Sequence, residues 1–550
     1  HPQRHPTCRA PPHCATMRAA SPRCRCLARM VFTAGAFAAI AAVVALLANR
    51  GGDGTLSPDL PTSLPLPGGP GGPAPPGAAF VHLFEWSWSD VAEECETWLG
   101  PKGFTAVQIS PPNEHIQGGA WWTRYQPVTY NLTSRSGDMA GFVNMVRRCT
   151  NAGVRIYADA VINHVAAGSG VSIAGKPYGN RATPIYSQED MHHDSGNPNH
   201  NCGVDNYADK HNVQYCDLVG LPDLCTACPR VQANIGAYLS RLASLGVTGI
   251  RVDAAKHQDA GELGQIILPL TKNLYVFHEV ISGANEGVRP DMYFGIGNVT
   301  EFNYARNLAP NFLADGKLQY LSTFGEQWGL MPTDKAVVFL DNHDTQRGEA
   351  QLTYKSGKLY ELANVFMLAH PYGYPKVMSS YFFNDHDQGP PSTPVHGQGG
   401  VACAPPPSAG QSQDAAPWVC EHRWPAVANM VAWRRSAAEE PVGNFQAPGG
   451  DTIGFCRGSA ACVALNRQES PTWSVTLHFS VPPGEYCDVI QSDDTSNCPT
   501  VQVGPDGTVT LQVPALGAVA VHTGKKRRST PMAVHVVGSV GGAGEAVAYV

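Results

Sequence analysis

The chain of 550 residues is predicted to be an α/β protein built on a closed (β/α)8, or TIM, barrel that is followed by an antiparallel β-domain. Two observations favour the barrel. Eight short apolar runs lie between residues 80 and 380, and several precede amphipathic segments such as 231–245. Parallel strands joined by helices produce this alternation. A doubly wound open sheet is the alternative, but the glycine-rich phosphate turn that usually follows an early strand is not evident.

The eight predicted strands are spaced so that helices fit between them. They are residues 80–84, 104–109, 154–162, 247–252, 274–280, 299–302, 336–340 and 376–380. Between the third and fourth strands, residues 165–222 are rich in Gly, Asn, Asp, His and Pro and are too long for a simple loop. We therefore expect an inserted irregular domain, domain B, at the carboxyl ends of the strands. The barrel itself would comprise residues 79–164 and 223–440.

The N-terminal segment, residues 1–50, predicts export from the cytosol. Six arginines precede a charge-free apolar run at 30–48, which is just long enough to span a bilayer. A cleavable signal peptide is the competing interpretation. Under either interpretation the rest of the chain is extracellular, secreted or anchored, and only this segment would contact a membrane. Twelve of the 16 cysteines follow the run, as expected in an oxidising compartment.

Three further regions differ in composition. Residues 51–78 are predicted to be a linker, because 16 of these 28 residues are glycine or proline. From residue 441 to 524, short alternating runs such as 473–479 and 508–513 predict an antiparallel β-sandwich. Residues 525–550 are expected to be a disordered tail. The net charge of -7 provides no basic surface for a nucleic acid, and a monomer is expected.

Three carboxylates follow predicted strands: Asp253, Glu279 and Asp344. Hydrolysis of a glycosidic bond needs one carboxylate to attack the anomeric carbon and another to protonate the departing oxygen, and a third can hold the distorted sugar. The same residues could form a structural ion pair or begin ordinary loops, and each alone would be weak evidence. Their order and their common position at strand ends favour the catalytic interpretation.

The neighbours of these carboxylates suggest different roles. Arg251 and Asp253 are two apart on a strand and share a face, and a nearby guanidinium lowers the pKa of a carboxylate, so Asp253 is expected to stay ionised. Glu279 ends an apolar strand, where burial favours the protonated form that a general acid needs. Asp344 shares its face with Asn342 in the same way.

Several segments are similar to those of a known family. They are Gly249-Ile-Arg-Val-Asp-Ala-Ala-Lys-His257, Phe277-His-Glu-Val280, Phe339-Leu-Asp-Asn-His-Asp344, Ser110-Pro-Pro-Asn-Glu114, Trp121-Trp-Thr-Arg-Tyr-Gln-Pro127, Asp159-Ala-Val-Ile-Asn-His164 and Trp418-Val-Cys-Glu-His-Arg-Trp424. Residues 79–522 thereby resemble α-amylases of the animal-type, chloride-dependent branch of glycoside hydrolase family 13. The resemblance implies endo-acting, retaining hydrolysis of α-1,4-glucosidic bonds in starch- or glycogen-type polysaccharides. Asp253 would be the nucleophile, Glu279 the acid/base and Asp344 the stabilising carboxylate.

The resemblance also implies residues that contact the sugar chain. An aromatic platform and a set of hydroxyl-binding side chains would line the cleft. For the two adjacent tryptophans, packing in the hydrophobic core is the alternative role. The implied residues are Trp121, Trp122, Tyr125, His164, Tyr207, Leu221, Lys256, His257 and His343.

Two bound ions are implied in the same way. Calcium would be held by Asn163, Asp223 and the backbone carbonyls of Gln214 and His257, and oxygen donors suit this hard cation. Gln214 stands where animal enzymes have arginine, a difference that need not matter for a backbone ligand. Chloride would be held by Arg251, Asn342 and Lys376. Lys376 replaces an arginine and loses its bidentate geometry, so weaker chloride binding is expected.

The cysteine pairings follow partly from the resemblance, which implies Cys95–Cys149, Cys202–Cys216, Cys403–Cys420 and Cys487–Cys498. Cys456–Cys462 is expected from proximity. Cys225 and Cys228 resemble a metal or redox motif, but no second pair lies at zinc spacing, so a disulfide is favoured. Two other sequence features are His192-His193, expected to be exposed, and Glu349, which stands where animal enzymes have a loop histidine.

Two alternatives remain at this stage. Heavy chains of amino-acid transporters are non-catalytic membrane proteins that resemble an amylase barrel behind one membrane span. The three carboxylates argue against that class, as does the lack of any cysteine between Ala48 and Glu94 that could bridge to a partner. Transglycosylases of the same fold would share the three carboxylates, and only a product profile would separate them from a hydrolase.

Overall fold

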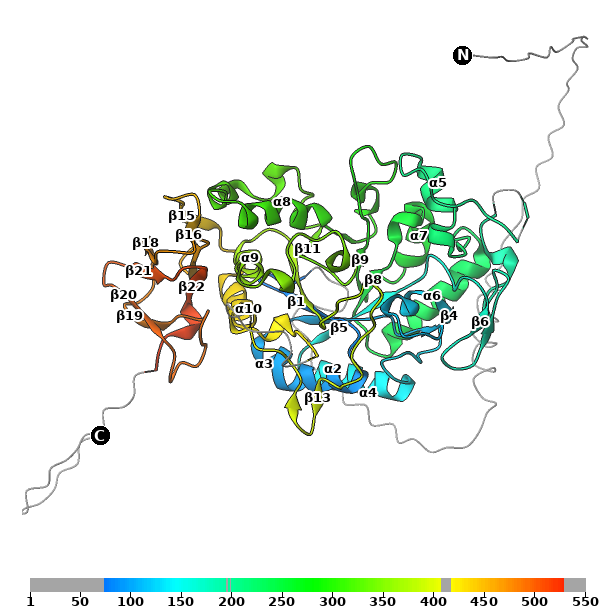
Figure 1. Cartoon of the computed structure of the whole chain (residues 1–550), viewed down its shortest axis with the longest axis horizontal. Coiled ribbons are helices and arrows are strands. Elements are labelled where there is room, and N and C mark those ends of the chain that lie inside the picture. Colours follow the sequence, from blue (N-terminus) through cyan, green and yellow to red (C-terminus); the bar gives the residue numbers. More distant parts are fainter. Residues whose placement is uncertain (1–73, 194–195, 198, 407–416, 529–550) are drawn as a thin grey trace, which may run out of the picture. The chain divides into compact units, whose positions relative to one another are not determined.

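The computed structural model describes residues 74–193, 196–197, 199–406 and 417–528. The predicted barrel is confirmed: eight parallel strands close in the order β1-β12-β11-β10-β9-β8-β5-β2 (Figure 1). Each predicted strand is present, and most are shorter than expected by a few residues. The strands are β1 Phe80–Leu83, β2 Ala106–Ile109, β5 Arg155–Ala160, β8 Gly249–Val252, β9 Tyr275–His278, β10 Asn298–Thr300, β11 Ala336–Val338 and β12 Tyr374–Ser379.

Helices follow seven of the eight strands. After β9 the crossover contains only a short 3-10 turn, η6 (Pro290–Tyr293), among the described residues. Side-chain caps mark several helix starts: Asp138 accepts a hydrogen bond from the Gly141 amide at 2.9 Å and begins α4. The barrel helices are α2 Trp88–Glu94 with η1 Cys95–Leu99 and α3 Gly100–Lys102, α4 Met139–Asn151, α6 Pro229–Ser244, α7 Ala260–Ile267, α8 Phe302–Leu313, α9 Lys358–Ala369 and α10 Pro425–Ala437.

The inside of the barrel is layered. Aromatic rings fill its amino-terminal end, where Phe80 lies 5.3 Å from Tyr157 and 5.7 Å from Phe277 between ring centroids. A Cβ on Gly249 would lie 2.3 Å from the Tyr157 ring, so only glycine fits in β8 at this level. Alternate residues on each strand face inward. Two residues further along, polar side chains replace the rings, and Arg251 lies above Gly249.

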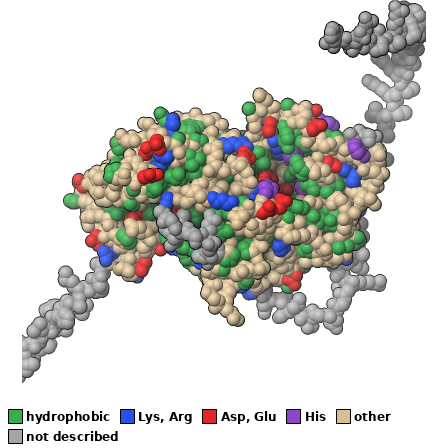
Figure 2. Space-filling model, viewed as in Figure 1, with side chains coloured by type: hydrophobic (Ala, Val, Ile, Leu, Met, Phe, Trp, Pro, Cys, Tyr) green, Lys and Arg blue, Asp and Glu red, His purple; other side chains and the backbone are tan. Residues whose placement is uncertain are grey.

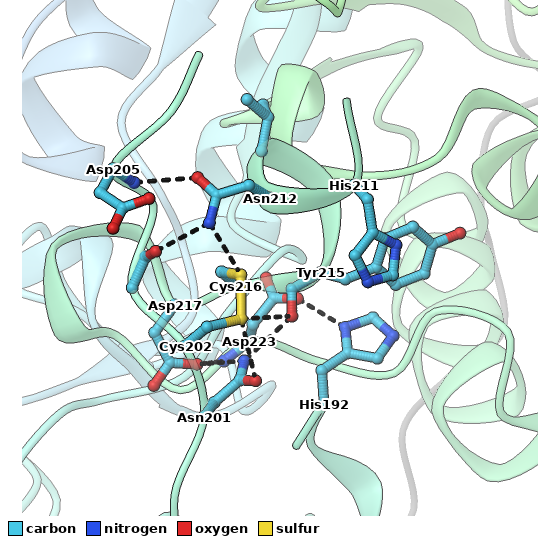
Figure 3. The surroundings of a disulfide bond; sticks show 12 residues. His192, Asn201, Cys202, Asp205, His211, Asn212, Tyr215, Cys216, Asp217 and Asp223 are labelled. Atoms are coloured by element: carbon cyan, nitrogen blue, oxygen red, sulfur yellow. Dashed lines mark hydrogen bonds and ion pairs between the residues drawn. A yellow bond between two sulfur atoms is a disulfide. The ribbon is translucent and has the colours of Figure 1, made fainter. Parts of the chain in front are cut away.

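The segment between β5 and α6 is irregular, as predicted. It contains only short elements: β6 Gly170–Val171, β7 Pro177–Tyr178, η3 Gln188–Asp190, α5 Lys210–Tyr215 and η4 Leu218–Gly220. Cys202–Cys216 closes a loop in the second half of the segment (Figure 3). Arg181, in the first half, pairs with Asp217. A disulfide and ion pairs therefore replace the apolar core that so short a segment cannot build.

The C-terminal β-domain is confirmed as two four-stranded antiparallel sheets, ordered β15-β16-β17-β22 and β18-β21-β20-β19. It contacts the barrel through α10, where the Trp433 indole donates to the backbone oxygens of Cys462 and Val521 at 3.2 and 3.0 Å (Figure 1). The strands are β15 Val442–Gln446, β16 Thr452–Arg457, β17 Ala461–Asn466, β18 Trp473–His478, β19 Gly484–Cys487, β20 Thr500–Val503, β21 Thr508–Val513 and β22 Gly517–His522.

All six expected disulfides are formed. They are Cys95–Cys149, Cys202–Cys216, Cys225–Cys228, Cys403–Cys420, Cys456–Cys462 and Cys487–Cys498. The motif at Cys225 is therefore a disulfide, as favoured over a metal site.

Two predicted boundaries are wrong. The linker was expected to extend to residue 78, but Ala78 is buried and its carbonyl accepts from Arg434 at 3.1 Å. The disordered tail was expected from residue 525, but Lys525 pairs with Asp493 at 3.2 Å and the Arg527 amide donates to the Glu485 carbonyl at 2.9 Å. Composition alone does not reveal these contacts, because their partners are distant in sequence.

The described residues contain no helix of the length and apolarity that a membrane crossing requires. The apolar run at 30–48 lies outside the described residues, as do most of the predicted linker and residues 529–550 of the predicted tail.

A buried charge network ties α2 to the segment that precedes α10. Glu94 is fully buried and accepts hydrogen bonds from His396 at 2.7 Å, His422 at 2.8 Å and the Arg423 Nε at 2.8 Å. Burial opposes ionisation of Glu94, but these hydrogen bonds outweigh it and hold the pKa of Glu94 well below its usual range.

Replacing Glu94 with glutamine should destabilise the fold by about 3 kcal/mol at pH 7, because it leaves the partly buried Arg423 without its carboxylate. A carboxylate with a lowered pKa stabilises fully above its unfolded pKa, about 4.3, and loses that contribution as the pH falls further. The difference between wild type and Glu94→Gln should therefore shrink below pH 4, as measured by denaturant unfolding. Glu96→Gln is the control: Glu96 forms an exposed pair with Arg148 at 2.5 Å, worth less than about 1 kcal/mol. Equal effects of the two changes would contradict the assignment.

Candidate active site

A cleft of about 500 Å³ opens at the carboxyl ends of the barrel strands. On the face drawn in Figure 2, acidic and histidine side chains gather around a hollow. The cleft is lined by the three predicted catalytic residues and by all nine residues predicted to contact sugar. These are Asp253, Glu279 and Asp344, with Trp121, Trp122, Tyr125, His164, Tyr207, Leu221, Lys256, His257 and His343.

Arg251 organises the floor of this cleft. Its guanidinium is buried and contacts three carboxylates: Asp159 at 2.6 Å, Asp253 at 2.8 Å and Glu279 at 2.5 Å. The three belong to successive neighbours in the barrel, β5, β8 and β9. A planar guanidinium presents several donors in a fixed geometry, so one residue can orient all three groups.

The protonation of this cluster differs from the sequence prediction. Burial raises the pKa of Asp253 above its ordinary value, and Arg251 only partly opposes that rise. Burial raises the pKa of Asp159 in the same way. Arg251 does lower the pKa of Asp253, as predicted, but burial outweighs it, so the expectation that Asp253 simply stays ionised is wrong. The sequence gives no measure of that burial. One cation cannot neutralise three buried carboxylates, so the cluster favours retaining a proton.

The turn after β8 fixes Glu279. The amide of Ala254 donates to a Glu279 carboxylate oxygen at 2.9 Å, and the Lys256 amide donates to the Glu279 carbonyl at 3.1 Å. Ala254 adopts a left-handed conformation with φ of 47°. The segment that carries Asp253 therefore also orients Glu279 through its backbone.

A second turn fixes Asp344 after β11. The side-chain oxygen of Asn342 accepts from the amides of Asp344 and Thr345 at 2.9 and 2.7 Å. Asparagine is suited to this local turn because its side chain mimics a backbone carbonyl. The Asp344 residue is exposed to the cleft, and the atoms that crowd around its carboxyl partly desolvate it and raise its pKa.

Aromatic residues form one wall of the cleft. They lie on the short turn η2 (Trp121–Tyr125), and the Trp121 indole donates to the His386 carbonyl at 3.0 Å. The Tyr125 ring stacks on His343 with centroids 5.1 Å apart, while its hydroxyl donates to Asp159 at 3.0 Å. The wall is thus tied to the same carboxylate cluster as Arg251.

The histidines of the cleft are neutral near pH 7. Burial lowers the pKa of His164 and of His257 to about 4 each, and it lowers the pKa of His343 well below its usual range. A neutral imidazole offers one donor and one acceptor, which suits sugar hydroxyls.

The opposite end of the cleft contains a pair that was not predicted. Lys256 donates to Glu286 at 2.6 Å, and its ammonium lies 4.6 Å from the centroid of the Tyr207 ring. Glu286, Leu218, Val219 and Ile281 all line the cleft. They lie in loops or in the short turn η4, where sequence periodicity gives no orientation. Asp159 was also not predicted as a residue of the site. It lies two residues after Tyr157 on β5, so the same two-residue spacing that was applied to Arg251 and Asp253 could have indicated that it faces into the barrel.

The predicted calcium ligands lie where the barrel meets the irregular segment. Asn163 and Asp223 are buried, and each has one side-chain oxygen without a hydrogen-bond partner among the described residues. His192, expected to be exposed, is largely buried and hydrogen bonds to the other Asp223 oxygen at 2.6 Å (Figure 3). Within the described ranges, no three His, Cys, Asp or Glu side chains form a metal-binding group. The donor set is one carboxylate, one amide and two backbone carbonyls, so its oxygen chemistry fits a calcium ion.

The third predicted chloride ligand is a buried lysine. Lys376 on β12 lies 4.5 Å from the centroid of the Phe339 ring, and its ammonium forms no ion pair with any described residue. Burial and neighbouring Arg251 lower the pKa of Lys376 to about 7. Two buried cations close to each other fit an anion between them.

Glu349, which stands where animal enzymes have a loop histidine, pairs with Arg306. Its carboxylate accepts from the Arg306 Nε at 2.7 Å, and Arg306 also donates to the Ser282 carbonyl at 2.7 Å. This exposed contact connects the loops that follow Asp344 and Glu279.

Together, an eight-stranded barrel, three carboxylates after its fourth, fifth and seventh strands, and an aromatic-lined cleft define a glycoside hydrolase. The family description "Alpha amylase, catalytic domain" matches residues 99–266, and "Alpha amylase, C-terminal all-beta domain" matches residues 444–524.

Individual relatives agree. The chain is 45% identical to an α-amylase of Streptomyces violaceus, over 82% of this chain and 74% of that protein. It is 40% identical to an α-amylase of Tenebrio molitor, over 82% of this chain and 98% of that protein. The crystal structure of α-amylase I from Eisenia fetida superposes with a TM-score of 0.73 and 35% identity, over 82% of this chain and 98% of that one. The chain belongs to the α-amylase family and is an enzyme.

Proposed function

We propose that the protein hydrolyses α-1,4-glucosidic bonds within starch- or glycogen-type polysaccharides and retains the anomeric configuration. The observation that carries the proposal is the contact of one buried guanidinium with both Asp253 and Glu279 inside an aromatic-lined cleft. A complex of the Eisenia fetida enzyme, as a mutant, with maltohexaose supports a glucan substrate.

In the proposed mechanism Asp253 attacks the anomeric carbon and forms a covalent glycosyl-enzyme intermediate. Glu279 donates a proton to the departing glycosidic oxygen and later removes one from the water that releases the product. The contact of Arg251 with both Asp253 and Glu279 supports this division by holding the two carboxylates side by side in the cleft. Asp344 would hold the distorted sugar at the reacting position, and Trp121, Trp122 and Tyr125 would stack on glucose rings.

A transglycosylase is the second candidate, since it would use the same three carboxylates. The non-catalytic transporter heavy chain is not favoured, because the relatives that match at 40–45% identity are α-amylases. The product profile on soluble starch separates hydrolysis from transfer.

We also propose that the catalytic part acts outside the cytosol as a monomer. Six disulfides among the described residues suit an oxidising compartment. The division into a barrel of residues 79–164 and 223–440, domain B at 165–222 and a C-terminal domain at 441–524 belongs to this proposal.

Asp253→Asn and Glu279→Gln should each lower kcat on soluble starch by at least about 1,000-fold, because each removes a group that takes part in bond exchange. Both changes preserve size and remove only the ionisable group. Asp291→Asn, at an exposed carboxylate paired with Arg289, should leave kcat unchanged. Activity within tenfold of wild type in either cleft variant would refute the mechanism.

We propose that calcium binds Asn163, Asp223 and the carbonyls of Gln214 and His257, where it would join the irregular segment to the barrel. The unpartnered oxygens of Asn163 and Asp223 support this site. When bound, the ion would supply a positive charge that fixes these oxygens. The chemical steps remain with the carboxylates of the cleft.

Chelation with EGTA should lower the melting temperature, because a ligand present at 100 times its Kd stabilises by about 2.7 kcal/mol. Asn163→Ala should abolish the rise in melting temperature that added calcium produces. Gln214→Ala is the matched control, since it keeps the backbone carbonyl and should keep the calcium response. Calcium-independent melting of the wild-type protein would exclude the site.

We propose that chloride binds between Arg251, Asn342 and Lys376, as in the animal-type branch. Lys376 faces Arg251 on β8, Asp159 on β5, Glu279 directly after β9 and Asp341 beyond β11. A lysine with a pKa of about 7 is only partly charged at neutral pH. Its attraction for an anion therefore declines as the pH rises above 7.

Chloride affinity, measured by calorimetry, should weaken between pH 6 and pH 8, by up to about tenfold per pH unit above the pKa of the lysine. Lys376→Arg should tighten binding and remove this pH dependence, because arginine stays charged throughout. Activity that is unchanged by exhaustive chloride removal, together with no heat of chloride binding, would eliminate the proposal.

A further inference from the structure

Arg347 is a partly buried arginine near the cleft, and unlike Arg251 it has no carboxylate partner among the described residues. It ends the short turn η9 (Thr345–Arg347), three residues after Asp344. Among the described residues, no Asp or Glu lies within ion-pair distance of its guanidinium, and its Nε has no hydrogen-bond partner. Partial burial lowers the pKa of Arg347, because it removes water from around the guanidinium charge. Such a position is costly unless other groups stabilise the charge.

Four aromatic rings supply that stabilisation. The guanidinium carbon lies 5.0 Å from the centroid of Trp121, 5.4 Å from Phe84, 5.5 Å from Tyr381 and 4.3 Å from Phe383. We call these four rings the aromatic cage. Each ring attracts a cation over its face, and the attraction is stronger where water is excluded.

The cage joins parts of the chain that are far apart in sequence. Phe84 follows β1, Trp121 lies on η2, and Tyr381 and Phe383 follow β12. Arg347 donates to the Tyr381 hydroxyl at 2.9 Å and also to the backbone carbonyl of His343. The second bond is made to the residue directly before Asp344. One side chain thus contacts both the wall of the cleft at Trp121 and the turn that carries the third carboxylate.

We propose that Arg347 is a positioning residue, which holds Trp121 and the Asp344 turn at a fixed separation so that a glucose ring stacked on the wall presents its bond to the carboxylates. The inference rests on the proposed glucan hydrolysis and adds a residue that does not itself line the cleft. Such a positioning role matters because a misplacement of about 1 Å in a catalytic group can lower the rate about 100-fold.

Arg347→Met keeps the length of the side chain but removes its charge and both hydrogen bonds, and kcat/KM on starch should fall about 100-fold. Arg347→Lys keeps a cation over the rings but loses the planar guanidinium with its several donors, so its kcat/KM should lie between those of Arg347→Met and wild type. Tyr381→Phe removes the hydroxyl that accepts from Arg347 and donates to the Gln388 carbonyl at 2.7 Å, and it should have a smaller effect in the same direction. Lys355→Met is the matched control, because exposed Lys355 lies 3.9 Å from the Phe383 centroid on the same ring but has no contact with Trp121. That variant should resemble wild type.

Two further measurements separate positioning from stability alone. Maltohexaose binding by calorimetry, in a Glu279→Gln background that does not turn over, should weaken about tenfold when Arg347→Met is added. The acidic limb of the pH–rate profile should move to higher pH in Arg347→Met but not in Arg347→Lys. The reason is that Asp344 faces Glu279, Arg251, Arg347 and His386, and removal of one positive charge raises its pKa.

The outcomes distinguish the two proposals. If wild-type protein does not hydrolyse starch, the proposed function fails. If wild type is active and Arg347→Met merely melts at lower temperature, with unchanged kcat/KM, maltohexaose affinity and pH profile at 25 °C, the positioning role is overturned.

Discussion

The contact of buried Arg251 with three carboxylates is the interaction on which the site depends. Asp159, Asp253 and Glu279 lie on or directly after three adjacent strands, and without a shared cation their mutual repulsion would favour uptake of further protons. The rest of the barrel keeps that cation in place. Aromatic rings fill the space beneath it, and Gly249 allows the Tyr157 ring to pack directly against β8. The aromatic layer at the amino-terminal end of the barrel thus supports the charged layer around Arg251.

Burial and the charge of Arg251 act in opposite directions on the protonation of this cluster. Burial disfavours charge on Asp159 and Asp253, whereas Arg251 favours it, and the balance leaves a proton within the cluster. Lys376 adds a second buried cation nearby, and its charge is itself close to a midpoint at neutral pH. The electrostatics of the site therefore depend on groups that compensate one another, so single substitutions here should alter several protonation states together.

Sequence patterns predicted those features that depend on local periodicity. Eight apolar runs became eight strands, and the spacing of two placed Arg251 beside Asp253. Features that depend on distant partners were missed. Burial reverses the expected pKa shift of Asp253, His192 is held by Asp223, and Lys525 is ordered by Asp493. Each of these facts requires knowledge of what surrounds a residue in space, which no spacing rule contains.

Backbone conformation completes the argument for a preorganised site. Ala254 and Val219 have φ angles of 47° and 45°, a left-handed region that residues with a Cβ adopt at a cost of about 1–3 kcal/mol. Both line the cleft. At Ala254 the conformation aims an amide at Glu279. Val219 exposes 86% of its surface at the edge of the cleft, so its apolar side chain gains no stabilisation from packing within the protein. The strained backbone at both positions fits a site whose surroundings hold it in the conformation that binds a sugar chain.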